Sequence, residues 1–167
     1  MLSELQQRNL AVVFGLVDAN RDGLLTSADL DVFVGRLIDR LDLQPTSPAL
    51  EYLLVAFAQW WRQICVQAGV DTRGAVTLAQ YVDGVDRGLR EDPDFLVEVG
   101  VLVDVLYADA VRPPDTVLGL AGMVAVCDAF GLPEPVAATL FEQLDEDGDG
   151  KVGQPEVRAA VRRVFLG

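Results

Sequence analysis

Twelve residues near the carboxyl end constrain this chain more than any other segment. Residues 145–156 carry carboxylates at positions 1, 3, 5 and 12 of the segment and a glycine, Gly150, at position 6. Oxygens at these positions can surround a hard divalent cation such as Ca²⁺, provided that the chain turns sharply at position 6. The bland alternative is an acidic turn without a ligand. The predicted ligands are Asp145, Asp147, Asp149, the backbone carbonyl of Lys151 and Glu156, with a water molecule at Gly153.

A second segment of the same kind covers residues 18–29, with Gly23 at position 6. Its alternative interpretation is an ordinary helix start, because Thr26 and Asp29 also form a capping box. Position 12 is Asp29, one methylene shorter than a glutamate, so it can reach an ion through a single oxygen. We therefore expect six ligands here, a geometry that suits Mg²⁺ better than a shell of seven oxygens does, and a weaker preference for Ca²⁺ than in loop 145–156. The predicted ligands are Asp18, Asn20, Asp22, the carbonyl of Leu24, Thr26 and Asp29.

Capping signals and apolar spacing predict helices through almost the whole chain. Ser3, Thr26 and Thr77 each precede, by three residues, a side chain that can complete a capping box. Pro48 after Ser47 is typical of a first helical turn. The predicted fold class is all-α, with only minimal antiparallel β contacts. Eight helices are expected, over residues 4–17, 28–43, 48–67, 78–89, 92–109, 120–130, 133–144 and 154–165.

The two acidic loops resemble those of EF-hands. The resemblance implies that such units come in pairs, whose apolar residues at loop position 8 meet in a short antiparallel contact. Two further loops are therefore expected between the outer ones, at 69–80 and 111–122, with Val76 and Leu118 at position 8. Together the four helix–loop–helix units would form two packed pairs.

Neither inner loop is expected to hold Ca²⁺. Loop 69–80 keeps a turn glycine, Gly74, and one carboxylate, Asp71, but Arg73 and Gln80 occupy ligand positions. Loop 111–122 has lost both its ligands and its turn glycine. Its positions 1, 3, 5, 6 and 12 are Val111, Pro113, Asp115, Thr116 and Gly122.

Four EF-hands in a chain of 167 residues are similar to the calerythrin and sarcoplasmic calcium-binding protein family. The resemblance implies an N-terminal EF-hand pair over residues 1–90 and a C-terminal pair over 91–167, packed face to face. It also implies Ca²⁺ buffering or signalling without catalysis. The two intact outer loops predict two bound Ca²⁺ ions and favour the buffering role, whereas the degenerate third loop departs from the calerythrin pattern. The alternative is a Ca²⁺ sensor that opens and docks on a protein partner. Sensors tend to expose Met-rich grooves, and this chain has only two methionines.

Composition narrows the remaining classes of function. A net charge of −13 disfavours nucleic acid and anionic membranes as partners. The chain has no histidine, which removes His-based catalysis and His-ligated zinc, so we expect no enzyme. We found no secretory signal or membrane-spanning run, and two cysteines far apart suit a reducing compartment. The expectation is a cytoplasmic monomer in which Trp60, Trp61, Cys65 and Cys127 are packing residues.

Overall fold

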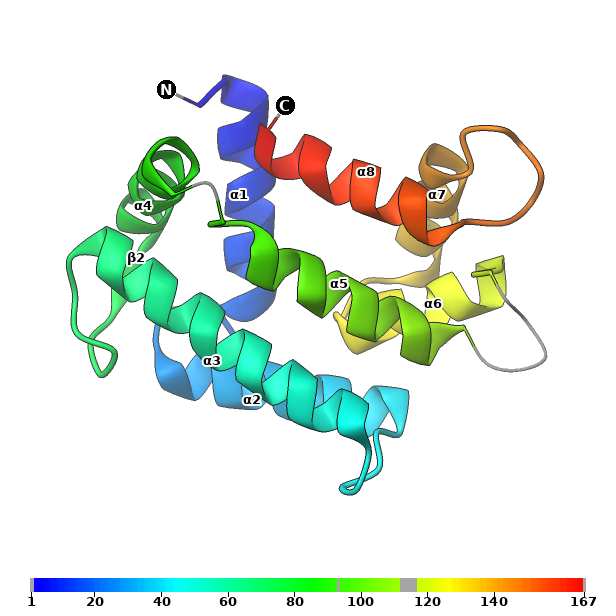
Figure 1. Ribbon diagram of the computed structural model, residues 1–167, viewed down its shortest axis with the longest axis horizontal. Helices are drawn as coiled ribbons and strands as arrows, with labels where there is room; N and C mark the ends of the chain where they lie inside the picture. The colour runs from blue at the N-terminus through cyan, green and yellow to red at the C-terminus, as the bar shows by residue number, and fades with distance from the viewer. Residues whose placement is uncertain (1, 93, 112–116, 167) are drawn as a thin grey trace.

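The computed structural model describes residues 2–92, 94–111 and 117–166, and within these ranges the chain forms eight α-helices and two short strands (Figure 1). The all-α prediction is confirmed. No helix of the described residues has both the length and the apolar character needed to span a bilayer. The elements are α1 Glu4–Val17, β1 Leu24–Leu25, α2 Ser27–Leu41, α3 Pro48–Ala68, β2 Val76–Thr77, α4 Leu78–Glu91, α5 Val97–Ala110, α6 Leu120–Ala129, α7 Glu134–Leu144 and α8 Gln154–Leu166.

Three helices begin where the sequence predicts capping boxes. Ser3, Thr26 and Thr77 each accept a hydrogen bond from the backbone amide three residues later, while the side chain at that residue binds back to the cap amide. These reciprocal bonds satisfy amides that have no partner within the helix. Capping therefore fixes the starts of α1, α2 and α4.

The four loops join in pairs through their eighth residues. β1 and β2 pair antiparallel, and Leu25 lies opposite Val76. In the second pair, Leu118 and Val152 form an isolated antiparallel bridge, with N–O distances of 3.0 and 2.9 Å. The predicted contact between eighth residues is confirmed in both pairs. It also fixes the register of loop 111–122, which has no ligand pattern to define it.

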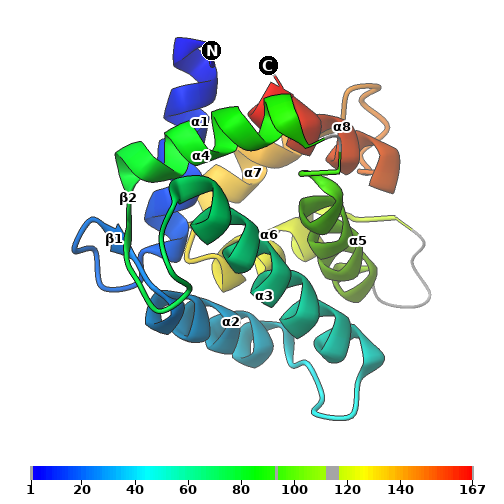
Figure 2. The ribbon, with the colours of Figure 1, turned by 60° about the vertical axis from the view of Figure 1, so that its left-hand side comes forward.

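Helices from the two halves of the chain pack against each other. α3 lies along α5, α2 contacts α6, and α1 contacts α8 (Figures 1 and 2). The larger core runs through these contacts and includes Trp60 and Trp61, both 6% exposed, as predicted for packing residues. A smaller core around Met123 and Phe141 lies between α6, α7 and the loop before α8. The division of the chain at residue 90 stays a prediction.

One helix begins later than the sequence suggests. The expected start at Asp92 is wrong, because α5 begins at Val97. Asp92 instead accepts a hydrogen bond from the amide of Asp94, at 2.9 Å, within a turn. This turn places Phe95, 3% exposed, against Gly88 of α4. Burial of one aromatic ring therefore takes precedence over an earlier helix start.

Candidate metal centre

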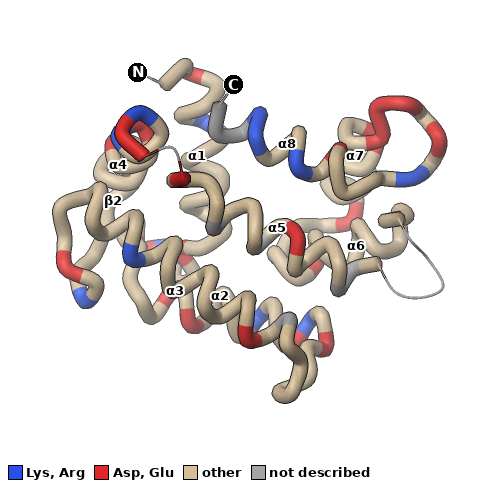
Figure 3. Tube along the Cα trace, in the orientation of Figure 1, with Lys and Arg blue, Asp and Glu red and all other residues tan. Residues whose placement is uncertain are grey.

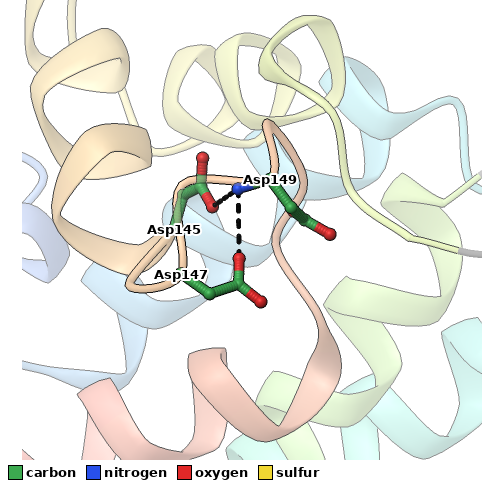
Figure 4. Close-up of side chains that lie close together, drawn as sticks. All are labelled: Asp145, Asp147 and Asp149. Atoms are coloured by element: carbon green, nitrogen blue, oxygen red, sulfur yellow. Dashed lines mark hydrogen bonds between the residues drawn. The ribbon is translucent and has the colours of Figure 1, made fainter.

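The loop between α7 and α8 gathers three carboxylates. Asp145, Asp147 and Asp149 each present an oxygen within 4.8 Å of the other two (Figure 4). The first is half-buried and the other two are exposed, so a cation could reach them from solvent. Three like charges at this distance repel one another unless a cation lies between them. The site is therefore suited to a hard divalent ion.

Backbone amides hold these carboxylates on the inner side of the loop. The amide of Asp149 donates to Asp145 Oδ1 at 3.0 Å and to Asp147 Oδ1 at 3.1 Å, as Figure 4 shows. The amide of Gly150 donates to Asp145 Oδ2 at 2.9 Å, and the amide of Lys151 donates to Asp149 Oδ1 at 2.9 Å. The fold thus arranges the acids through the chain itself, leaving other lone pairs on their oxygens for an ion.

Gly150 turns the chain as the sequence predicts. Its φ is +78°, and Gly148, at position 4, has φ +71°. Side chains rarely adopt this left-handed conformation, but glycine does so at little cost. The two glycines let the backbone amides point toward the carboxylates.

Glu156 closes the loop from its far end. Its Oε2 accepts the amide of Gly153 at 2.6 Å, and its Oε1 accepts the amide of Glu146 at 3.4 Å. The side chain therefore spans the opening of the loop from position 12 to position 2. Glu146 also forms an ion pair with Arg163 of α8 at 2.6 Å. Asp29, one methylene shorter at the same position of loop 18–29, accepts hydrogen bonds from the amide and hydroxyl of Thr26.

Loop 18–29 reproduces the same bonds position by position. The amide of Asp22 donates to Asp18 Oδ1 at 3.3 Å and to Asn20 Oδ1 at 2.9 Å. The amide of Gly23 donates to Asp18 Oδ2 at 2.9 Å, and that of Leu24 to Asp22 Oδ1 at 2.9 Å. Gly23 has φ +81°. Two segments far apart in the sequence therefore adopt one loop conformation.

The left-handed backbone conformation at position 4 of loop 18–29 was not predicted from the sequence. Arg21 has φ +58°, although its side chain makes that conformation costly. Its counterpart in the other loop is Gly148, and that equivalence was the available signal. The hydrogen bonds around Arg21 stabilise a conformation that the residue alone disfavours.

The acids of loop 18–29 are arranged less openly than those of loop 145–156. Asp18 and Asp29 are buried, at 7% and 4% exposure. Asp29 Oδ2 accepts both the amide of Thr26 at 3.0 Å and its hydroxyl at 2.6 Å. Position 3 of this loop is Asn20, so an amide oxygen stands where loop 145–156 has the carboxylate of Asp147. The residues at positions 1, 3 and 5 nevertheless accept the same backbone amides in both loops.

Loop 69–80 differs from the two outer loops in its backbone conformation. Gly74, expected to turn the chain at position 6, does not adopt a positive φ; Gly69, at position 1, does, with φ +71°. The expectation about Gly74 was wrong because the loop has no side chain at position 1 to draw in its amide. That amide instead donates to the carbonyl of Asp71 at 2.8 Å. Trp61 Nε1 donates to the carbonyl of Thr72 at 3.0 Å, so the loop is held by the core.

Loop 111–122 is described only at its ends. Pro113, Asp115 and Thr116 lie outside the described residues. The amide of Val111 donates to the carbonyl of Tyr107, as the first residues of loops 18–29 and 145–156 do with the residues four positions before them. The Tyr107 hydroxyl donates to the carbonyl of Val152 at 2.9 Å. This contact attaches α5 directly to the loop that gathers the carboxylates.

A charged contact fixes α8 beside that loop. Arg158 of α8 binds both carboxylate oxygens of Asp104 in α5, and Gln154 donates to the same carboxylate at 2.8 Å. These hydrogen bonds, led by those from Arg158, hold the pKa of Asp104 below its usual value of 3.8. The first turn of α8, which carries Glu156, is therefore anchored to α5. Figure 3 shows the acidic run before it, in which Lys151 is the basic residue.

The two cysteines are both buried and belong to neither loop. Burial, with a smaller contribution from the charge of Asp71, raises the pKa of the Cys65 thiol to about 11. Burial also raises the pKa of Cys127. Thiols in this state are poor metal ligands and poor nucleophiles.

Comparisons with known proteins agree with this geometry. The EF hand family model matches residues 137–161. Calerythrin from Saccharopolyspora erythraea is 22% identical over 169 aligned residues, which cover 100% of this chain and 96% of that protein. The match spans both acidic loops and the segment between them.

Two solved structures share the fold over nearly the full length. A calcium-binding protein of Streptomyces coelicolor, described in connection with prokaryotic calcium-mediated regulation, is 25% identical with a TM-score of 0.77, covering 96% of this chain and 97% of that one. A sarcoplasmic calcium-binding protein from amphioxus is 14% identical with a TM-score of 0.73, covering 100% and 92%. With its paired loops and eight described helices, this chain has the EF-hand fold and is similar over nearly its whole length to proteins of the calerythrin and sarcoplasmic calcium-binding protein type.

Proposed function

We propose that this protein binds two Ca²⁺ ions, one in each outer loop. The observation that carries the proposal is the shared set of amide-to-carboxylate bonds, which aims the oxygens of positions 1, 3 and 5 inward in both loops. The proposed ligands supply six oxygens in loop 18–29, and seven in loop 145–156 when one water and both oxygens of Glu156 are included, within the range that Ca²⁺ takes. The proposed ligands are Asp18, Asn20, Asp22, Leu24, Thr26 and Asp29, and Asp145, Asp147, Asp149, Lys151 and Glu156.

The proposal extends to Mg²⁺, which competes more strongly in loop 18–29. Glu156 reaches from Gly153 to Glu146, a span that leaves both of its oxygens at the loop opening. Asp29 is shorter, and one of its oxygens is already engaged twice by Thr26. One oxygen from position 12 favours six-coordination, which suits the smaller ion.

Buffering is the role that packing supports best. A sensor needs an apolar groove that opens to a partner helix. Here Met123 is 5% exposed, and Phe33 of α2 and Phe57 and Trp60 of α3 are buried in the core. We therefore propose a Ca²⁺ carrier and not a sensor. We further propose that the protein is a cytoplasmic monomer without catalytic activity.

A regulatory role is the second candidate. It is favoured by the 25% identical Streptomyces coelicolor protein, whose structure is connected with calcium-mediated regulation. An apolar fluorescent dye separates the two roles. A large rise in dye fluorescence on adding Ca²⁺ supports the sensor, whereas an unchanged or smaller signal supports the buffer.

Titration calorimetry tests the proposed sites. The full chain should bind two Ca²⁺ ions, and Glu156→Gln should bind one, because the amide replaces a charged ligand at position 12. Glu142→Gln, the same change at an exposed position of α7, should still bind two. A stoichiometry of two in Glu156→Gln would exclude loop 145–156 as a site, and three or four ions in the unaltered chain would place metal in the inner loops.

A further inference from the structure

Two side chains of α5 reach the segment that joins loop 145–156 to α8, which lies beside α5 (Figure 1). Asp104 and Tyr107 are three positions apart, so their side chains leave α5 on the same side. The Tyr107 hydroxyl donates to the carbonyl of Val152 at 2.9 Å, and Asp104 accepts a hydrogen bond from Gln154 at 2.8 Å. These contacts hold positions 8 and 10 of the loop, on either side of position 9.

The peptide group after Val152 connects Tyr107 to Glu156. A peptide group is planar and almost always trans, so its carbonyl and its amide hydrogen point in opposite directions. The carbonyl of Val152 accepts the Tyr107 hydroxyl and the amide of Leu118, at 2.9 and 3.0 Å. At the other end of the same peptide group, the amide of Gly153 donates to Glu156 Oε2 at 2.6 Å. Hydrogen bonds at the two ends of one peptide group polarise and strengthen each other.

Packing holds the phenol ring in place, and the N-terminal pair of loops has no phenol there. Tyr107 is partly buried and packs against the smaller core, which contains Val152. It lies four residues before loop 111–122, as Cys65 lies four residues before loop 69–80. Cys65 is fully buried, and its thiol is only a weak donor. The contact from the phenol is therefore a feature of the C-terminal pair.

We propose that Tyr107 is a positioning residue for Glu156 and thereby sets how tightly loop 145–156 holds Ca²⁺. This role rests on the proposed function, in which Glu156 is the ligand at position 12. Tyr107 supplies no ligand itself and acts through the peptide group of Val152 and Gly153. A loop whose position 12 is already placed loses less freedom when it binds an ion, so it binds more tightly and releases the ion more slowly.

Tyr107→Phe tests the proposal, because it removes the hydroxyl and keeps the ring. We expect Ca²⁺ to bind loop 145–156 about three- to tenfold more weakly in titration calorimetry, the factor that one hydrogen bond contributes. Dissociation, followed by mixing the Ca²⁺-loaded chain with chelator in stopped flow, should be faster. Tyr52→Phe is the control, since that side chain is 63% exposed, and it should bind like the unaltered chain. Equal affinity of Tyr107→Phe and Tyr52→Phe overturns the proposal.

A double substitution distinguishes local positioning from a general loss of stability. Glu156→Gln is expected to confine Ca²⁺ to loop 18–29. Adding Tyr107→Phe to Glu156→Gln should leave the remaining Ca²⁺ affinity unchanged. A loss of affinity there as well would show that Tyr107 acts through the stability of the whole fold, and would overturn the proposal.

Nuclear magnetic resonance of the metal-free chain separates this role from the proposed function. In chelator, Tyr107→Phe should move the amide proton resonance of Gly153 upfield, because its hydrogen bond to Glu156 weakens, and should leave that of Gly23 in loop 18–29 in place. An unmoved Gly153 resonance overturns the positioning role, whether or not Ca²⁺ binds. A moved resonance in a chain that binds no Ca²⁺ in loop 145–156 supports the contact with Glu156 and overturns the proposed function instead.

Discussion

At the scale of single residues, one methylene distinguishes the two outer loops. Glu156 contacts amides at positions 2 and 9, whereas Asp29 is confined to Thr26 at position 9. Asp29→Glu should therefore add a second oxygen to the ion in loop 18–29. We expect its preference for Ca²⁺ over Mg²⁺ to rise on the order of tenfold, by competition titration of the two ions.

Asp31→Glu is the control for this change. It makes the same substitution two residues along α2, at an exposed side chain outside the loop. Its ion selectivity should equal that of the unaltered chain. If Asp29→Glu leaves the selectivity unchanged, the length of the position 12 side chain does not govern the choice of ion.

Local chemistry explains which residues could be predicted. The spacing of Asp145, Asp147 and Asp149 is read within one loop, and their gathering follows from amides only a few positions away. Gly74 shows the limit of such reasoning. A glycine at position 6 fits a turn. In the two outer loops, however, the amide of that glycine donates to the carboxylate at position 1. Gly69, at position 1 of this loop, has no carboxylate, and Gly74 does not adopt a positive φ. Residue type and hydrogen-bond partner must therefore be considered together.

At the scale of elements, the packing of Phe95, in the turn before α5, against α4 depends on Gly88, which has no side chain. A Cβ at Gly88 would lie 2.4 Å from the ring of Phe95, which is 3% exposed, so the ring or the backbone would have to shift. Overpacking of this kind costs about 1–3 kcal/mol. Gly88→Ala should therefore lower the free energy of unfolding, measured by urea denaturation, although alanine is the better helix former.

Gly15 in α1 supplies the opposite case. It is exposed, and a Cβ there meets nothing within 4 Å. Gly15→Ala should raise the free energy of unfolding by about 0.5–1 kcal/mol, because alanine loses less backbone entropy in a helix. A Gly88→Ala protein as stable as Gly15→Ala would mean that Phe95 is free to leave its place.

The joint between α5 and α8 should depend on pH. Hydrogen bonds from Arg158 and Gln154 lower the pKa of Asp104 in the folded state. Its contribution is therefore complete above the unfolded pKa, about 4, and is lost as pH falls through the lower folded value. Asp104→Asn should destabilise the protein at pH 7 and flatten the fall in melting temperature below about pH 4.

Calorimetry in chelator at several pH values checks this, since bound metal would mask the effect. Asp31→Asn removes an exposed acid from α2 and should leave the slope of melting temperature against pH close to that of the unaltered chain. An equal change of slope in both variants would show that Asp104 acts only through net charge.

The contacts between α4 and α5 and between α5 and α8 show why helices were easier to predict than the contacts between them. Capping boxes are complete within four residues, so Ser3, Thr26 and Thr77 mark helix starts without any tertiary information. The bond between Asp104 and Arg158 joins residues 54 positions apart. The delayed start of α5 follows from the packing of Phe95 on another helix. Such contacts have no local signal.

At the scale of the whole molecule, charge and packing oppose each other. The two outer loops hold eight acids and two bases, nearly half of the net charge of −13. The hydrophobic core joins both halves of the chain and brings these acids into one compact body. Repulsion among the acids therefore acts against folding until cations neutralise it. Two Ca²⁺ ions would offset four of these charges.

Metal binding should consequently stabilise the fold. At free Ca²⁺ 100 times the dissociation constant, each site adds about 2.7 kcal/mol, so two sites add about 5 kcal/mol. For a chain of this length about 1 kcal/mol shifts the melting temperature by 2–4 °C, so we expect a rise of about 10–20 °C in calorimetry. Sodium chloride at equal ionic strength screens the same charges without occupying the loops and should give a much smaller rise. If sodium chloride matches Ca²⁺, the stabilisation is screening alone; if Glu156→Gln removes about half of the Ca²⁺ effect, it comes from the loops.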